Sequence, residues 1–341
     1  MDTVKCDILV LGSGAAGLVC ALEAARFADV RLVTKREIAE SNTYYAQGGI
    51  ASVTHKDDSF ERHIADTLEA GAGLCRRDAV EIVVREGPAR VKELVELGVR
   101  FSRTEGGDDL ALGREGGHSA ARIVHYRDVI GRELETALLA AVRANPRISV
   151  RANCLAIDLI GGGEEGGVSG CYALDLRSKT IFAIVAPHTV LATGGAGKIY
   201  LYTSNPDVAT GDGMAMAYRA GASLANLEFV QFHPTCLYHP EAKSFLISET
   251  LRGEGARLRN LSGEEFMKRY DPRGELAPRD VVARAMDREM KRSGDKSVLL
   301  DITHRPAAWL RKRFPNVYEN CLRFGIDIAA QPIPVVPAAH Y

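Results

Sequence analysis

The hydrophobic pattern of residues 1–35 changes period twice. Residues 6–11 form a short apolar run, residues 12–17 read GSGAAG, and residues 18–27 carry apolar side chains at helical spacing. Residues 30–34 are apolar again and indicate a second strand. A strand, a glycine turn, a helix and another strand, in this order, predict the first β-α-β unit of a nucleotide-binding fold.

A glycine turn between a strand and a helix can bind the pyrophosphate of a dinucleotide. Gly12 would allow the tight turn, Gly14 the approach of the backbone to the phosphates, and Gly17 the close packing of helix on strand. The second strand ends in Lys35 and Arg36, where an NAD-binding protein usually has an acid for the ribose hydroxyls. Three alternatives stay open: NADP bound through its 2′-phosphate, a flavin protein that holds its adenosine differently, or two solvated basic residues.

Later segments continue to alternate between helical and strand periods. Amphipathic spacing predicts helices at residues 59–72, 76–97, 127–144 and 214–220. Apolar runs and alternation predict strands at 149–160, 168–177, 180–185 and 189–193, with a glycine-rich turn at 161–167. The segments that show neither period, and are predicted to be loops, are 41–49 and 106–117.

The chain changes character after residue 228. Residues 229–334 contain more arginine and proline than the preceding part. Their pattern predicts helices at 280–292 and 307–323 and a short apolar strand at 298–302. We interpret this part as a second domain that covers a substrate.

Composition narrows the range of partners. Of the 341 residues, 46% are hydrophobic and 26% are charged, and 43 basic against 44 acidic residues give a formal charge of −1. The chain therefore lacks the basic field that attracts nucleic acid, and it has no apolar run of the roughly 20 residues needed to span a bilayer. Seven widely spaced cysteines without a C-x-x-C pair favour reduced cytoplasmic thiols over a disulfide framework or a metal site.

Eight motifs follow one another along the chain. They are GSGAAG (12–17), SNTYYAQGG (41–49), ATGG (192–195), GDGMAMAYRAGA (211–222), EFVQFHPT (228–235), RGEGA (252–256), GELAPRD (274–280) and PVVPAAHY (334–341). Together they resemble the flavoprotein family of succinate dehydrogenase, fumarate reductase and L-aspartate oxidase, and the resemblance covers the whole chain.

The resemblance implies an α/β fold in which an α+β domain is inserted into a Rossmann-like FAD-binding domain. The FAD-binding domain would cover residues 1–228, and the inserted capping domain, which binds the substrate, residues 229–335. Residues 336–341 would begin the return to the FAD-binding domain. Members of the family continue into the rest of this return and a helical C-terminal domain, so the resemblance implies that both are absent from the 341 residues.

The resemblance also implies FAD as the cofactor. The match places its contacts on Gly12, Ser13, Gly14, Ala15, Ala16, Gly17, Lys35, Asn42, Thr43, Ala46, Gln47, Gly48, Gly49, Ala156, Thr193, Gly194 and Asp212. Residues 13–17 would hold the pyrophosphate, Lys35 the adenosine end, residues 42–49 the flavin edge and Asp212 the ribitol. Respiratory members attach the flavin covalently to a histidine at the position of Asn42. An amide cannot form that bond, so the FAD is expected to be noncovalent.

The motif GREGGHS (113–119) indicates the substrate. L-Aspartate oxidases resemble this chain in carrying a glutamate at the position of Glu115, where it would meet the ammonium group of the substrate. The implied reaction is FAD-dependent oxidation of L-aspartate to iminoaspartate, the first step of NAD biosynthesis through quinolinate, with oxygen or fumarate as electron acceptor. Quinolinate synthase, which would consume the iminoaspartate, is the implied protein partner.

The resemblance assigns further residues to the two carboxylates and to proton transfer. The carboxylates would be bound by Gln231, His233, Ser248 and His340. Arg279 would act as an electrostatic clamp and as the proton donor when fumarate is reduced, with Glu249 and Arg252 as its proton relay. An arginine is a poor base on its own, so the proton acceptor for aspartate is left open. The expected catalytic residues are Arg279, Glu249, Arg252 and Glu115.

Two other functions stay open at this stage. A soluble flavoprotein of the fumarate reductase or succinate dehydrogenase type would use the same carboxylate-binding residues, although Glu115 argues against it. A truncated, non-catalytic fragment that only binds nucleotide or a partner would also fit, because the family continues beyond residue 341. An assay that compares aspartate with succinate as reductant of the flavin separates the two enzymes.

Overall fold

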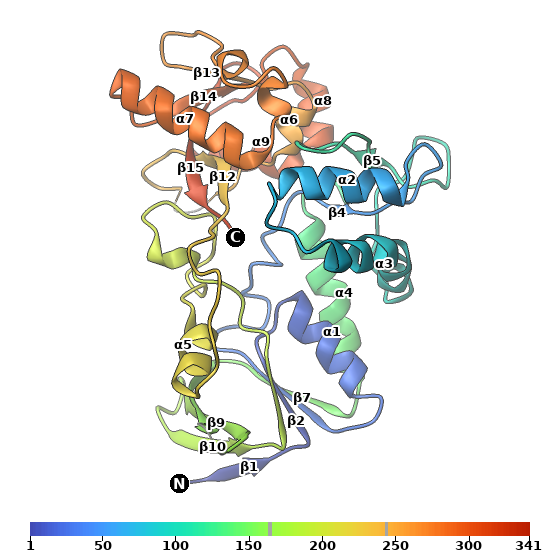
Figure 1. Cartoon of the computed structure of the whole chain (residues 1–341), viewed down its shortest axis with the longest axis vertical. Coiled ribbons are helices and arrows are strands. Elements are labelled where there is room, and N and C mark those ends of the chain that lie inside the picture. The colour runs from blue at the N-terminus through green and yellow to red at the C-terminus, as the bar shows by residue number, and fades with distance from the viewer. Residues whose placement is uncertain (163–165, 243–244) are drawn as a thin grey trace. The chain divides into compact units, whose positions relative to one another are not determined.

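The computed structural model describes residues 1–162, 166–242 and 245–341 (Figure 1). The chain forms two compact units, each made of three segments. Unit 1 comprises residues 1–45, 131–201 and 205–230. Unit 2 comprises residues 46–130, 202–204 and 231–341. Part of the turn predicted at 161–167, residues 163–165, lies outside the described residues.

Unit 1 contains the predicted nucleotide-binding elements. Its helices are α1 (Ala15–Ala24), α4 (Ile130–Ala144), η1 (Gly197–Ile199) and α5 (Asp212–Arg219). Its strands are β1 (Thr3–Lys5), β2 (Ile8–Leu11), β3 (Val30–Val33), β7 (Ile148–Arg151), β8 (Cys154–Gly161), β9 (Val168–Asp175), β10 (Ile181–Val185) and β11 (His188–Leu191). Strands β11, β2, β3 and β7 form a parallel sheet in that order, which confirms the predicted α/β class.

The first β-α-β unit forms because its strands are buried and its turn has glycine where other backbone atoms come close. All four residues of β2 are buried, as expected for a parallel strand covered on both faces. Gly12 has φ +114°, and a Cβ there would collide with the carbonyl oxygen of Ala192. A Cβ at Gly17 would collide with the carbonyl oxygen of Gly12. The predicted reasons for Gly12 and Gly17 are confirmed, since helix α1 can start close to β2 only without side chains there.

A second sheet in unit 1 corrects one predicted strand. Strands β8, β9 and β10 form an antiparallel meander, and β1 adds to β10 in parallel. The single strand predicted at 149–160 is wrong, because β7 belongs to the parallel sheet and β8 to the meander. Between them Asn153 has φ +55°, a left-handed conformation that interrupts an extended strand. Alternation alone did not reveal this change of sheet.

Unit 2 mixes helices with two antiparallel sheets (Figure 1). Its helices are α2 (Phe60–Ala70), α3 (Arg77–Glu96), α6 (Thr250–Gly253), η2 (Met267–Arg269), η3 (Gly274–Leu276), α7 (Arg279–Ser293), α8 (Ala307–Arg313) and α9 (Pro315–Arg323). Its strands are β4 (Ile50–Ala51), β5 (Leu112–Gly113), β6 (Ile123–Val124), β12 (Phe232–Leu237), β13 (Arg257–Arg259), β14 (Val298–Asp301) and β15 (Ile333–Ala339). The larger sheet has the order β12, β15, β14, β13, and the smaller one β4, β6, β5.

The helix predicted at 307–323 is divided in two. Helix α8 ends at Arg313, and α9 begins at Pro315. Proline has no N–H and its ring collides with the carbonyl of the preceding turn, so it starts a helix rather than continuing one. Phe314 and Val317, on either side of the break, are fully buried in the main core of unit 2.

The compact units divide the chain differently from the expected domains. Residues 46–130, expected in the FAD-binding domain, form one unit with residues 231–341. Strand β15, which ends at Ala339, hydrogen-bonds to β12 and β14 within unit 2, and the start of a return into the FAD-binding domain at residues 336–341 stays a prediction. Within the described ranges, no helix is long and apolar enough to cross a membrane.

Candidate active site

The glycine turn of unit 1 leaves the first turn of α1 open to an anion. Gly14 is the N-cap of α1. Because glycine has no side chain, the N-cap residue makes no side-chain hydrogen bond to the first turn. The backbone N–H of Ala15 donates to Thr43 Oγ1 at 3.0 Å, which places the predicted flavin segment beside the turn. A Cβ at Gly14 would lie 3.3 Å from the same hydroxyl. Thr43 thus occupies the N–H of Ala15, and the backbone N–H groups that follow it in the first turn of α1 fit a pyrophosphate.

Four other predicted cofactor residues of unit 1 lie close to this turn or to each other. Ser13 is buried and its hydroxyl donates to the Ile38 carbonyl at 2.7 Å, so only its backbone is available to a ligand. A Cβ at Gly194 would lie 3.7 Å from Asn42 Nδ2. Thr193, which precedes Gly194, packs so closely on the start of α5 that a Cβ at Gly213 would collide with its hydroxyl.

Lys35 and Asp212 form an ion pair, although the resemblance assigns them to different parts of the cofactor. The Lys35 ammonium donates to the Asp212 carboxylate and to Thr210 Oγ1, the latter at 2.6 Å. Burial acts to raise the pKa of Asp212, but the hydrogen bonds from Lys35 and Thr210 outweigh it and leave that pKa lowered. Ala156 lies elsewhere, in β8, where it packs on the core around Leu11.

The rest of the predicted flavin segment belongs to unit 2, since the division falls between Tyr45 and Ala46. A Cβ at Gly48 would lie 2.7 Å from Glu115 Oε1, and one at Gly49 would collide with Ile123. Glycine therefore lets the backbone approach the GREGGHS loop at Gly48 and strand β6 at Gly49. Gln47 is buried, and its Oε1 has no hydrogen-bond partner among the described residues.

Arg279 connects the predicted catalytic residues of unit 2. It is the first residue of α7, directly after Pro278, whose fixed φ sets the start of the helix. Its Nε donates to Glu249 Oε2, and its Nη1 donates to Gln231 Oε1 at 2.9 Å. Its Nη2 lies 3.7 Å from Glu115 Oε2. Burial acts to lower the pKa of Arg279, but Glu249 and Glu115 raise it, so the guanidinium stays charged.

Glu249 is buried between two arginines. Its Oε1 lies 3.0 Å from Arg252 Nη2 and accepts from the backbone N–H of Gly116 at 3.0 Å. Burial acts to raise the pKa of Glu249, but the charges of Arg252 and Arg279 outweigh it and hold the pKa below its usual range. The structure thus joins Arg279, Glu249 and Arg252 in one chain of contacts, in the order expected of a proton relay.

Glu115 is the second buried carboxylate of this cluster, and its environment differs from that of Glu249. Its side chain is 12% exposed, and its Oε1 has no hydrogen-bond partner among the described residues. Burial and the neighbouring charge of Glu249 raise the pKa of Glu115, against the opposing charges of Arg279 and Arg252. Glu115 therefore holds a proton more readily than Glu249 and has an oxygen free for a donor.

The two predicted histidines face each other, His233 in β12 and His340 directly after the end of β15. The rings of His233 and His340 have centroids 5.2 Å apart in an edge-to-face arrangement. His233 Nδ1 accepts from the backbone N–H of Thr235 at 3.1 Å, so the neutral ring carries its proton on Nε2. Burial lowers the pKa of His340 to about 4, with Arg279 adding to the effect, and burial likewise lowers that of His233. Both rings are neutral donors or acceptors at neutral pH.

Ser248, the fourth predicted carboxylate ligand, is fully buried beside Glu249. Its hydroxyl donates to Thr250 Oγ1 at 3.2 Å and accepts from the backbone N–H of Thr250 at 3.3 Å. The Thr250 hydroxyl also hydrogen-bonds to Glu115. Sequence reasoning missed Thr250, although its position next to the predicted Ser248 and Glu249 could have indicated it.

A buried arginine network, also missed, holds the end of the GREGGHS loop. The fully buried Arg122 binds both carboxylate oxygens of Asp58, at 2.7 and 2.8 Å, and Asp66 Oδ2 at 2.6 Å. Its Nη1 also lies 3.2 Å from His118 Nδ1. Burial lowers the pKa of His118 to about 4, with Arg122 adding to the effect. His118 lies within a quoted motif, but the acids that bind Arg122, Asp58 and Asp66, are distant in sequence and carried no signal.

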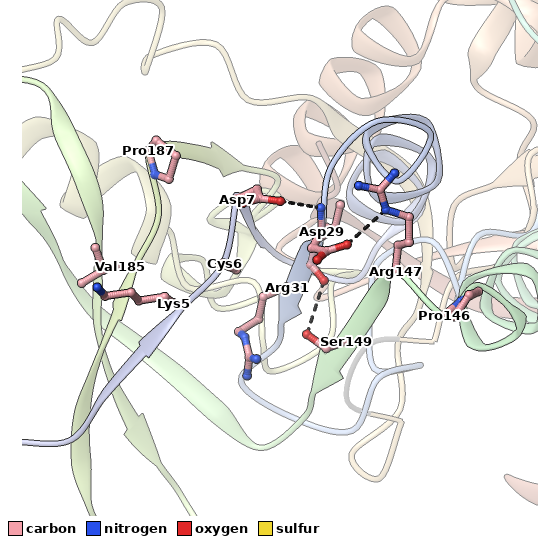
Figure 2. Close-up of a pocket in the computed structure, with 11 residues that line it drawn as sticks. Lys5, Cys6, Asp7, Asp29, Arg31, Pro146, Arg147, Ser149, Val185 and Pro187 are labelled. Atoms are coloured by element: carbon pink, nitrogen blue, oxygen red, sulfur yellow. Dashed lines mark hydrogen bonds and ion pairs between the residues drawn. The ribbon is translucent and has the colours of Figure 1, made fainter.

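A pocket of about 620 Å³ opens elsewhere in unit 1 (Figure 2). Asp7, Asp29 and Arg31 line it near the amino ends of β2 and β3, with Arg147 and Ser149 near the start of β7. Arg147 Nε donates to Asp29 Oδ1 at 3.1 Å. Ligands of open parallel sheets bind at the carboxyl ends of the strands, and the residues that line this pocket include no predicted cofactor residue. Among the described residues, no cluster of three or more side chains could hold a metal ion.

Comparisons with known proteins identify the family. Residues 7–341 match the family described as FAD binding domain. The L-aspartate oxidase of Pseudomonas aeruginosa is 53% identical over 345 residues, which cover 98% of this chain and 64% of that protein. The chloroplastic L-aspartate oxidase of Arabidopsis thaliana is 50% identical over 347 residues, which cover 98% of this chain and 53% of that protein.

A solved structure of E. coli quinol fumarate reductase has a TM-score of 0.92 at 33% identity, covering 100% of this chain and 61% of that one. The chain thus spans less than two thirds of the length of these relatives. The resemblance, the fold class and the cofactor predicted from the motifs are confirmed. This chain belongs to the family of FAD binding domains, and its cofactor is FAD.

Proposed function

We propose that this chain carries the active site of an FAD-dependent oxidation of L-aspartate to iminoaspartate, with oxygen or fumarate as electron acceptor. The observation that carries the proposal is Glu115 Oε1, a buried carboxylate oxygen without a partner among the described residues, in a cluster that also holds the guanidinium groups of Arg279 and Arg252. A dicarboxylate substrate with an ammonium group needs hydrogen-bond donors for its carboxylates and an acceptor for its ammonium group. The 53% identity to an L-aspartate oxidase supports the same substrate.

The substrate carboxylates would bind to the donors of unit 2. Arg279 supplies a charged, planar group, and His233 supplies a neutral ring whose Nε2 carries the proton. Gln231, Ser248 and His340 complete the proposed carboxylate ligands. Charge-assisted bonds from a guanidinium are the strongest of these contacts, so Arg279 would determine which carboxylate is held beside Glu115.

The ammonium group would meet Glu115. Its raised pKa, caused by burial and by Glu249, makes Glu115 a better proton acceptor than an exposed glutamate. When bound, FAD would supply the acceptor for the hydride that leaves the substrate Cα. In the separate reduction of fumarate to succinate, Arg279 would deliver a proton to fumarate, and Glu249 and Arg252 would replace it through the chain of contacts described above.

The cofactor would be bound without a covalent link. We propose that residues 13–17 hold the pyrophosphate, that residues 42–49 contact the flavin, and that Lys35, Ala156, Thr193, Gly194 and Asp212 complete the contacts. The open N-terminus of α1 supports the first assignment. The pairing of Lys35 with Asp212 supports a common role for them on one side of the cofactor.

Quinolinate synthase and a cytoplasmic location complete the proposal. Iminoaspartate is a reactive product, so an enzyme that consumes it would act next. All seven cysteines are free thiols in the structure, which supports a reducing compartment.

A single assay separates the proposed enzyme from a succinate dehydrogenase or fumarate reductase. The oxidised flavoprotein is mixed anaerobically with aspartate or with succinate, and bleaching of the flavin absorbance is followed. Aspartate should reduce the flavin and succinate should do so far more slowly. Reduction by succinate alone would favour the second enzyme, and reduction by neither would favour a non-catalytic role.

A further inference from the structure

A buried carboxyl lies behind the flavin segment of unit 1. Glu135, in the second turn of α4, is fully buried, and its Oε2 accepts from the Ser41 hydroxyl at 3.0 Å. Its other oxygen, Oε1, is buried and has no hydrogen-bond partner among the described residues. None of the predicted functions uses this residue. Burying a carboxyl group that makes only one hydrogen bond costs free energy of folding, so its place in the fold calls for an explanation.

The Ser41 hydroxyl links Glu135 to residues 42–44, which follow Ser41 in the chain. The oxygen that donates its proton to Glu135 also accepts from the backbone N–H of Tyr44 at 3.1 Å. This bond closes a turn around Asn42 and Thr43, the two predicted cofactor residues between Ser41 and Tyr44. The guanidinium of Arg132, one turn earlier on α4, lies 5.3 Å from the centre of the Tyr44 ring. Helix α4 therefore holds both ends of the turn.

The turn formed by residues 41–44 also contacts the predicted pyrophosphate site. Thr43 Oγ1 accepts from the N–H of Ala15 at the start of α1. A Cβ at Gly14 would lie 3.9 Å from the Ser41 Cβ. Ser41 thus lies between the carboxyl of Glu135 and the helix start at which an anion would bind.

We propose that Glu135 is a positioning residue for FAD, which acts through the Ser41 hydroxyl to fix the turn that carries Asn42 and Thr43. It touches neither substrate nor reacting atoms. Its effect is to keep the Thr43 hydroxyl on Ala15 and the Asn42 side chain near Gly194.

If Glu135 also acts through its charge, the affinity for FAD depends on pH. A residue that only packed in the core would give no such dependence. Burial raises the pKa of Glu135 to about 7, and the Ser41 hydrogen bond opposes this rise. The other charged groups on the packed elements are Arg132, which stacks on Tyr44, and Glu40 and Glu133, which are half-buried. Ionisation would place a negative charge one side chain away from the helix start that would hold the FAD phosphates. FAD affinity should therefore fall as the pH rises through 7.

The experiment titrates the apoprotein with FAD, followed by quenching of flavin fluorescence, between pH 6 and pH 8.5. The variants are Ser41→Ala, Glu135→Leu, their double mutant and the isosteric Glu135→Gln. Thr136→Ala is the matched control, because its exposed hydroxyl donates only to the carbonyl of Arg132 on its own helix. Hydrogen exchange of the Tyr44 amide is measured in parallel without FAD.

The parent should lose affinity for FAD roughly three- to tenfold between pH 6 and 8.5, as expected for a charge about 10–15 Å from an anion. Glu135→Gln should bind at any pH as the parent does at pH 6. Ser41→Ala and Glu135→Leu should each weaken binding and speed Tyr44 exchange, and the double mutant should lose no more than the worse single mutant. The control should match the parent.

Two results would overturn the proposal. One is parent-like FAD binding and parent-like Tyr44 exchange in Ser41→Ala, a variant that removes one small group and is expected to fold even if Glu135→Leu does not. The other is the same pH profile for the parent and Glu135→Gln. The inference depends on FAD as the cofactor and not on aspartate as the substrate, so loss of aspartate turnover with intact FAD binding would contradict only the proposed function.

Discussion

Glu115 Oε2 lies 3.7 Å from Arg279 Nη2, while the Nε of the same guanidinium donates to Glu249. One arginine thus faces two carboxylates, of which Glu249 is held as an anion by Arg252 and Glu115 is not. This asymmetry leaves Glu115 as the carboxylate able to respond to an incoming cation.

Replacing Glu115 by glutamine should therefore affect one substrate only. The variant keeps the shape of the side chain and loses the charge that meets an ammonium group, a bond worth about 1.5–3 kcal/mol. We expect kcat/KM for aspartate to fall roughly ten- to a hundredfold, with little change in fumarate reduction by a chemically reduced flavin. Equal losses in the two reactions would show that Glu115 does not distinguish the amine.

Asn42 should leave the flavin extractable. Since an amide has no ring nitrogen to bond to the isoalloxazine, acid precipitation of the yellow protein should release the flavin into the supernatant. Absorbance spectra of the supernatant and of the washed pellet test this directly. Flavin absorbance retained in the pellet would contradict it and would require another covalent anchor.

Arg279→Lys should abolish most fumarate reduction although it keeps the charge. The guanidinium uses Nε for Glu249 and Nη1 for Gln231 at the same time, and a single ammonium cannot reproduce this planar geometry. Turnover with fumarate and a reduced viologen dye measures the effect, with Arg284→Lys on the exposed face of α7 as the control. Near-normal turnover in Arg279→Lys would reassign Arg279 to a structural role.

Stability should depend on pH through a histidine outside the site. His125 is 8% exposed, and burial, with Arg313 adding to it, lowers its pKa from 6.5 to about 4. Between these values the unfolded chain binds more protons than the folded one, so this contribution is complete above pH 6.5 and is lost as the pH falls to 4. The loss amounts to at most about 3 kcal/mol.

Urea unfolding at pH 7 and pH 4.5 tests this effect. His125→Gln should lose about 2–3 kcal/mol less than the parent between the two pH values. His55→Gln, which changes an exposed histidine, is the control and should behave as the parent does. An unchanged pH dependence in His125→Gln would contradict the assignment to this ring.

Arg122→Met should destabilise the protein strongly. It would leave Asp58 and Asp66 as buried charges without their partner, at a cost of about 3–5 kcal/mol in the free energy of unfolding. Arg26→Met, which breaks the exposed pair with Glu23, should cost at most about 1 kcal/mol. Chemical denaturation of the two variants makes the comparison, and a similar small loss in both would show that the Arg122 network is not a buried ionic cluster.

Local patterns predicted the parts of the fold that local rules control. The turn at 12–17 and the helices α2, α3 and α7 were predicted within a few residues, because period and glycine spacing are properties of the chain itself. The break at Pro315 was also locally encoded, and a stricter use of the proline rule would have predicted it.

Local sequence rules could not predict contacts between residues that are far apart in the sequence. Glu135 and Ser41 are 94 positions apart, and no local pattern indicated that their side chains are hydrogen-bonded. The change of sheet at Asn153 likewise depends on which strands come to lie beside β3 and β9. The motifs placed Arg279, Glu249 and Arg252 in one site through resemblance, and the ion pairs that join them came only from the structure.

The interleaving of the two units along the chain bears on how the protein is made. The polypeptide passes from one unit to the other after residues 45, 130, 201, 204 and 230. On the ribosome, the parallel sheet of unit 1 cannot be completed until β11 has emerged, long after β2 and β3. Strands β2 and β3 are therefore made before their sheet partners β7 and β11, and residues 46–130 of the other unit are synthesised in the interval.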